Sequence, residues 1–167
     1  FTGTVCCLHN IKQCSNGKII RHSRQLSKIV RNNTPMKVPN VHANQLLSAF
    51  TKEACDKIMP HITEVYLKLG ATVCEAGGLL THAYFQQGCV LSLLTVLENG
   101  SEIECGNIGR EGAFGLFSAM YGRVSFSRCT VQLQGPMVRC DIKPLQVLFQ
   151  NSAHIQDLFV SYSETLL

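Results

Sequence analysis

Residues 89–115 read CVLSLLTVLENGSEIECGNIGREGAFG. Two apolar runs, Cys89–Leu97 and Glu102–Ile108, stand on either side of Asn99 and Gly100. An Asn-Gly pair between two such runs is a strong signal for a β-hairpin, because both residues tolerate the positive φ angles of a type I′ turn. The stretch therefore predicts two antiparallel strands joined by a tight turn.

Other short apolar runs flank this hairpin on both sides, with glycines between many of them. They lie at residues 65–69, 72–75, 82–86, 129–134 and 137–142. Short strands at this spacing, separated by glycine turns, are typical of an antiparallel roll or barrel. No apolar run approaches the roughly 18 residues of a membrane span, so the sequence predicts no membrane partner.

Helical patterns lie at both ends of this series of strands. Asn44 and Thr51 are placed as N-caps of two short helices, and apolar residues recur at helical spacing over 145–149 and 155–162. The predicted fold class is α+β and mainly β: an antiparallel β-roll of the double-stranded β-helix or jelly-roll kind. N-terminal helices and the start of a C-terminal helix flank it.

Charge divides the chain into two parts. Residues 1–42 contain seven Lys or Arg and no Asp or Glu, whereas residues 43–167 contain eight basic and eleven acidic residues, a net of −3. We expect a basic and poorly ordered extension over 1–42 and one domain over 43–167. The basic extension has the charge to contact phosphates, but it lacks the interleaved aromatic residues that stack on single strands.

Nine cysteines and no recognisable secretion signal favour free, mostly buried thiols in a cytoplasmic protein over a disulfide scaffold. Cys6, Cys7 and Cys14 lack the C-x₂-C spacing of iron–sulfur ligands, and we expect them to be unligated. His82 could ligate a metal, but an ordinary hydrogen-bonded strand histidine is the simpler interpretation. No catalytic motif is present, and we expect neither a metal site nor enzymatic activity.

Three motifs in fixed order carry a resemblance to a known family. They are VLENG at 96–100, GREG at 109–112 followed by AFG, and RCTV at 128–131. Together they resemble the effector domain of Crp/Fnr-type bacterial transcription regulators, in the cyclic-nucleotide-binding-domain superfamily. The resemblance covers residues 43–167. It implies a β-roll sensor, a helix that forms a homodimer, and a winged helix-turn-helix that binds DNA. The chain stops inside the expected dimerisation helix, so we expect the DNA-binding half to be missing.

The resemblance also implies a ligand site. Its candidate residues are Gly109, Arg110, Glu111, Gly112, Arg128 and Thr130, with a helix over 113–120 following the turn. In the family, a helix N-terminus and an arginine hold a phosphate, and a carboxylate holds the ribose.

This chain departs from that pattern at two positions. Arg110 stands between Gly109 and Glu111, and Arg128 follows Ser127, the position of the family's phosphate-binding arginine. A shift of one residue on a strand turns a side chain to the opposite face. Three interpretations therefore remain open: a cyclic-nucleotide site, a turn in which Glu111 only caps locally or pairs with Arg110 or Arg128, and a site for another small anionic or apolar effector.

We therefore expect an effector-sensing regulatory domain of a Crp/Fnr-like regulator with no resident cofactor. The alternative is a cyclic-nucleotide-binding-type regulatory or interaction module of another signalling protein, such as a kinase or a channel.

Overall fold

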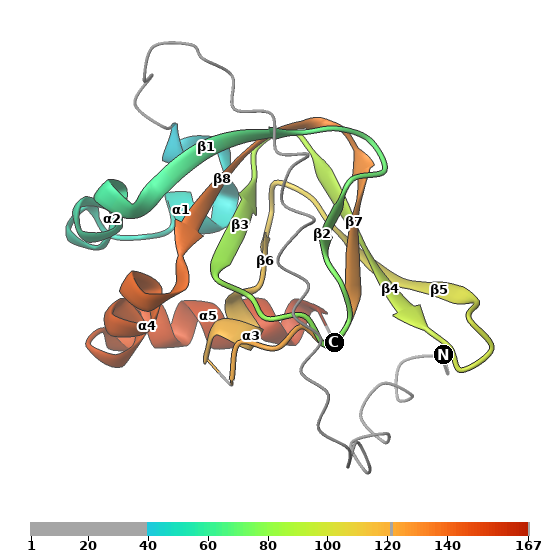
Figure 1. Cartoon of the computed structure of the whole chain (residues 1–167). Coiled ribbons are helices and arrows are strands. Elements are labelled where there is room, and N and C mark those ends of the chain that lie inside the picture. The colour runs from blue at the N-terminus through green and yellow to red at the C-terminus, as the bar shows by residue number, and fades with distance from the viewer. Residues whose placement is uncertain (1–39, 121, 167) are drawn as a thin grey trace.

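The strands of the computed structural model, which describes residues 40–120 and 122–166, form two antiparallel four-stranded sheets (Figure 1). The first sheet has the order β1-β8-β3-β6, and the second has the order β2-β7-β4-β5. The strands are β1 (Ile62–Leu67), β2 (Thr72–Cys74), β3 (His82–Gln86), β4 (Val90–Val96), β5 (Glu102–Ile108), β6 (Ala113–Phe114), β7 (Arg128–Leu133) and β8 (Gly135–Asp141). The predicted β-roll is confirmed.

Helices precede and follow the roll, and one short helix, α3, lies between β6 and β7. Most of the helices cover the outer face of the first sheet (Figure 1). They are η2 (Val41–Ala43), α1 (Gln45–Ser48), α2 (Lys52–Ile58), η3 (Met59–His61), α3 (Leu116–Met120), α4 (Ile142–Gln150) and α5 (Ala153–Leu166). Both predicted N-caps are confirmed: Asn44 accepts from Leu47 N–H at 3.0 Å and Thr51 from Ala54 N–H at 3.2 Å.

Two apolar clusters hold these layers together. Phe85 and Val138 of the first sheet pack outward against the helices, where Leu47 and Ile155 are fully buried. Alternate residues of the same strands, such as Met137, point into the roll and meet the second sheet. The central strand β3 is therefore buried on both faces, whereas the edge strand β1 alternates buried and exposed residues.

The hairpin lies where the sequence predicts it, but its turn is of another type. Gly100 has a φ of +83°, whereas Asn99 is not among the residues with positive φ. Leu97 O accepts a hydrogen bond from Gly100 N–H, and Asn99 Oδ1 accepts one from Ser101 N–H. A type I′ turn requires positive φ at both central residues, so that prediction is wrong.

Two further expectations need correction. The helix expected over 113–120 begins only at Leu116, because Ala113 and Phe114 pair with β3 as strand β6 and Gly115, with φ +92°, turns the chain into α3. The expectation of mostly buried thiols holds for Cys89, Cys129 and Cys140, whereas Cys55 and Cys74 are partly exposed and Cys105, on the edge strand β5, is exposed.

The expected extension and its cysteines, Cys6, Cys7 and Cys14, lie outside the described residues, apart from the end of the segment. Val41 belongs to that end, and its side chain is buried in the helix-facing core. None of the described helices combines the length and the apolar character that a membrane crossing requires.

Candidate functional site

The turn at Gly109–Gly112 is closed by its own atoms. Gly109 N–H donates to Glu111 Oε1 at 2.6 Å, and Gly112 N–H donates to the Gly109 carbonyl at 3.2 Å. The side chains of Arg110 and Glu111 are exposed. Glu111 therefore caps the turn locally, and neither side chain is among those that line the cavity described below.

Asn44, which is fully buried, joins the N-terminal helices to this turn through hydrogen bonds. Its Nδ2 donates to the Gly112 and Gln86 carbonyls, each at 2.8 Å, while its Oδ1 caps α1. The next residue, Gln45, donates its N–H to the Arg110 carbonyl at 2.8 Å. Helix α1 thus starts on the backbone of the turn.

The C-terminal helix reaches the same turn through Tyr162. Its hydroxyl accepts from Ala113 N–H at 2.9 Å and donates to the Ala113 carbonyl at 3.1 Å. Burial raises the pKa of Tyr162 to about 12, so the hydroxyl stays protonated and able to donate. A Cβ on Gly112 would lie 2.6 Å from Cζ of Tyr162, so only glycine leaves room for the ring.

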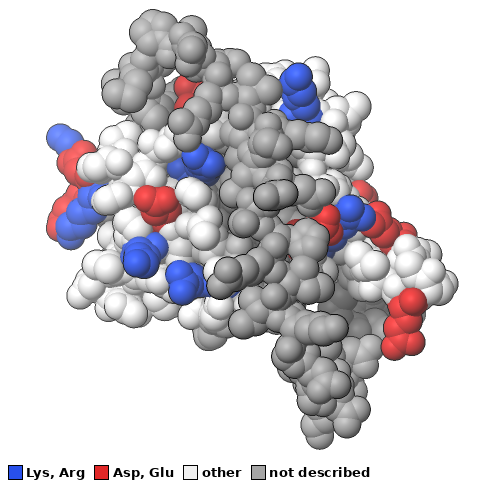
Figure 2. Space-filling view, viewed as in Figure 1, with Lys and Arg blue, Asp and Glu red and all other residues white. Residues whose placement is uncertain are grey.

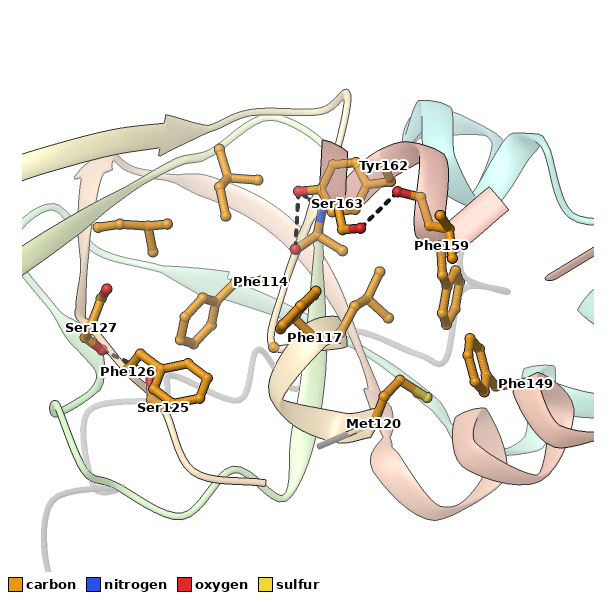
Figure 3. Close-up of a pocket in the computed structure, with 16 residues that line it drawn as sticks. Phe114, Phe117, Met120, Ser125, Phe126, Ser127, Phe149, Phe159, Tyr162 and Ser163 are labelled. Carbon is orange, nitrogen blue, oxygen red and sulfur yellow. Dashed lines mark hydrogen bonds between the residues drawn. The ribbon is translucent and has the colours of Figure 1, made fainter. Parts of the chain in front are cut away.

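A cavity of about 160 Å³ lies beside this contact, between the open end of the roll, α3 and α5 (Figure 3). Phe149 and Phe159 stack at one end, with ring centroids 5.8 Å apart, and Ser125 and Ser127 lie at the other. The lining residues are Leu93, Ile108, Ala113, Phe114, Gly115, Leu116, Phe117, Met120, Ser125, Phe126, Ser127, Phe149, Phe159, Val160, Tyr162 and Ser163. Apolar and aromatic side chains dominate this wall.

Arg128 lies on the outer face of the second sheet. Its guanidinium pairs with Glu75, at 3.1 Å from Nε to the carboxylate, and with Glu102. These carboxylates raise the pKa of Arg128, Glu102 foremost. In the space-filling view, red and blue meet where the β4–β5 hairpin leaves the body (Figure 2). Arg128 thus takes part in an outer ion-pair network.

Thr130 lies on the same outer face as Arg128, because the alternate residues Cys129 and Val131 are buried inside the roll. Thr130 is opposite Ser92, whose hydroxyl donates to Glu104 at 2.5 Å. Of the six candidate residues, the structure groups Gly109–Gly112 in one turn beside the cavity wall and places Arg128 and Thr130 on the far side of the second sheet. None of the six is a lining residue.

His82 has ordinary strand partners. Its ring nitrogens lie 2.8 Å from Thr81 Oγ1 and 3.2 Å from Asp141 Oδ1. Burial and the nearby Arg139 lower the pKa of His82, while Asp141 raises it. In the part of the chain that the structure describes, no group of three or more His, Cys, Asp or Glu side chains could hold a metal ion.

Comparison with known proteins identifies the fold. No model of a known protein family matches the sequence, and no curated protein matches it. Solved structures do match: the β-roll with its flanking helices is the fold of cyclic-nucleotide-binding domains, found in the sensor domains of transcription regulators and in the regulatory domains of protein kinase A.

The sensor domain of the transcriptional regulator DNR from Pseudomonas aeruginosa superimposes with a TM-score of 0.61 at 13% identity, over 76% of this chain and 90% of that one. The Thermus thermophilus catabolite activator protein gives 0.59 at 13% identity, over 71% of this chain and 55% of the other. The regulatory domain of Toxoplasma gondii protein kinase A, solved with cAMP, gives 0.57 at 13% identity, over 65% of this chain and 41% of that one. This chain thus spans about half or less of the two longer proteins.

Proposed function

We propose that this chain is the effector-sensing regulatory domain of a Crp/Fnr-like transcription regulator. The observation that carries the proposal is the Tyr162–Ala113 contact at the edge of the cavity. One face of α5 forms part of the cavity wall. The same helix is hydrogen-bonded to β6, the strand that follows the Gly109–Gly112 turn. A molecule in the cavity would contact α3 and α5 together. Its binding would therefore favour one arrangement of α5 against the roll over another.

Helix α5 packs against both the N-terminal region and α4. Such packing suits a helix that transmits the effect of ligand binding. Phe159 contacts Phe50 of the N-terminal region, at 5.9 Å between centroids, and Phe149 of α4. Asn44 links the N-terminal helices to Gly112, on which the Tyr162 ring packs. The turn, the cavity wall and both helical regions thus form one contiguous set of contacts. If α5 moved from one arrangement to another, contacts in all of these parts would change.

In the complete regulator, α5 would continue into a dimerisation helix followed by a DNA-binding domain. Effector binding would shift a cytoplasmic homodimer between DNA-competent and DNA-incompetent states. The match over 90% of the DNR sensor domain supports this assignment. The protein kinase A match supports the other candidate, a regulatory module of another signalling protein. Under either candidate we propose no enzymatic activity for this domain.

Hydrogen–deuterium exchange tests the sensing role. Separate samples of the chain are exposed to indole, cyclic AMP and cyclic GMP, and exchange is followed at the α3 and α5 amides. We expect at least one compound to slow exchange in both helices. A compound that binds with no change in α5, or a panel in which no compound changes exchange anywhere, contradicts the proposed function.

A further inference from the structure

The wall of the cavity carries no charged side chain among the described residues. Phe114, Phe117, Phe126 and Phe159 supply aromatic surface, and Leu93 and Met120 supply aliphatic surface. An anionic ligand in such surroundings would lose its hydration with no opposite charge to replace it, which costs several kcal/mol in apolar surroundings. The wall therefore suits an uncharged molecule.

Three of the hydroxyl groups of the wall already donate to carbonyls of the chain. Tyr162 donates to Ala113 at 3.1 Å, Ser163 to Val160 at 2.7 Å and Ser125 to Ser127 at 2.7 Å. Figure 3 draws these three bonds as dashed lines between residues of the wall. A ligand that needs these hydroxyl groups as donors would have to break the bonds, whereas an apolar ligand leaves them in place.

The arginines nearest in sequence are engaged or located elsewhere. Arg128 is on the outer face with Glu75 and Glu102, and Arg110 is exposed on the turn. Arg123 follows α3, but it is not a lining residue, and its carbonyl accepts from Leu80 N–H at 2.6 Å. The fourth described arginine, Arg139, lies opposite Tyr84 in the β3–β8 pair and is not a lining residue either. None of the four described arginines therefore lines the cavity in which a phosphate would have to be held.

The volume limits the size of the occupant. An apolar cavity of about 150 Å³ lined by Leu, Ile and Phe binds benzene. The cavity here has about 160 Å³, and its lining residues Phe117 and Phe126 are 52% and 67% exposed, so it opens to solvent. A single aromatic ring fits inside, and a fused second ring can extend to the mouth.

From these four observations we infer that the cavity binds a small, uncharged, apolar molecule, of the size of one aromatic ring or a fused bicycle such as indole, and does not bind a cyclic nucleotide. The inference rests on the proposed function, because it names the class of effector that the sensor would take. Aromatic contact and apolar burial would supply the binding free energy.

Thermal melting of the full chain with four probes tests the inference: indole, benzyl alcohol, choline and cyclic AMP. At ten times its dissociation constant, a ligand of the folded state raises the Tm of a domain of this size by about 5 °C. We expect a rise of this kind with indole and benzyl alcohol and none with cyclic AMP. Choline is included because an aromatic wall could attract a cation.

Two variants locate the site. Phe126→Ala removes an exposed ring from the mouth, and Leu133→Ala removes a similarly exposed side chain, 55% accessible, from β7. We expect the first to weaken indole binding by about tenfold, from the lost apolar contact, and the second to leave it unchanged. Both positions are exposed, so neither substitution threatens folding.

Each outcome has a distinct meaning. A Tm rise with cyclic AMP or choline and none with indole or benzyl alcohol overturns the inference and leaves the proposed sensing role intact. Equal weakening of indole binding by both variants places indole outside the cavity and also overturns the inference. Indole binding that depends on Phe126, without any response of α5 in hydrogen exchange, supports the inference and contradicts the sensing role.

Discussion

Tyr162 of α5 and Ala113 of β6 exchange two hydrogen bonds, 2.9 Å to the N–H and 3.1 Å to the carbonyl, across 49 residues of sequence. One phenol hydroxyl thereby satisfies both polar groups of one backbone unit. Ala113 is buried, so each group would otherwise lose a partner away from water, and the contact fixes α5 to the strand beside the cavity.

Replacing Tyr162 with Phe should destabilise the fold and release α5. The loss of both bonds leaves two backbone groups unpaired, which costs roughly 1–3 kcal/mol. Urea denaturation measures this loss, and amide exchange should become faster in α5. The exposed Tyr66→Phe serves as a control with little effect. Equal stability of the two variants would show that the Tyr162 bonds contribute nothing.

Gly112→Ala should clash with the Tyr162 ring. The added methyl group would lie 2.6 Å from Cζ of Tyr162, and overpacking of this kind costs roughly 1–3 kcal/mol. In a Tyr162→Ala background the same substitution should cost much less, because the obstructing ring is gone. A double-mutant cycle measured in urea checks this coupling. Additive effects would contradict the packing.

Asn44→Ala should be the most damaging of the cap substitutions. It removes the N-cap of α1 and two hydrogen bonds to Gly112 and Gln86, all in a fully buried position. We expect a loss of about 2–4 kcal/mol, against about 1 kcal/mol for Thr51→Ala, which removes only a helix cap. Comparable losses in the two variants would mean that Asn44 acts as a cap alone.

Arg128→Gln should leave ligand binding unchanged. The side chain lies outside the roll in a partly exposed network with Glu75 and Glu102, where ion pairs contribute about 1 kcal/mol or less. Calorimetric titration of the variant with indole should give the wild-type affinity within a factor of about two. A tenfold change in the dissociation constant would correspond to about 1.4 kcal/mol of binding free energy. A tenfold loss would place Arg128 at the ligand.

His82 should make stability depend on pH. Its pKa is lower in the folded chain than the ordinary value of 6.5, chiefly because of burial and Arg139. The folded state therefore binds the proton more weakly than the unfolded state. Stability from this group is fully present above pH 6.5 and is lost as the pH falls through the lowered folded value.

Melting curves at falling pH test this dependence. The Tm of the wild type should fall by a few degrees more than that of His82→Asn between about pH 7 and pH 5. His61→Asn, at an exposed position in η3, should follow the wild type. Parallel curves for the wild type and His82→Asn would refute the dependence.

Local signals in the sequence predict much of the fold. Asn44 and Thr51 cap helices because their side chains meet nearby backbone N–H groups, and the hairpin forms at Asn99 and Gly100 because glycine supplies the positive φ. The turn type could not be read in the same way, since it depends on how the two strands pair. The sequence does not predict strand β6, because only its pairing with β3 distinguishes it from the start of a helix.

The cavity depends on contacts that no local pattern reveals. Leu93, Met120, Phe149 and Tyr162 are far apart in sequence and meet only when α5 packs across the end of the roll. The spacing of α5 predicts that Tyr162 lies on its apolar face, but not that its hydroxyl meets Ala113. The alternation of β7 does predict that Arg128 and Ser127 point to opposite faces, and the structure places Arg128 outside.

The most direct test of the account is an NMR measurement of intermolecular NOEs between indole and the methyl groups of the chain. The account predicts NOEs from the indole ring to the methyls of Leu93, Ile108 and Met120, which line the cavity. NOEs confined to the methyls of Leu133 or Val147, which lie outside the cavity, would contradict it.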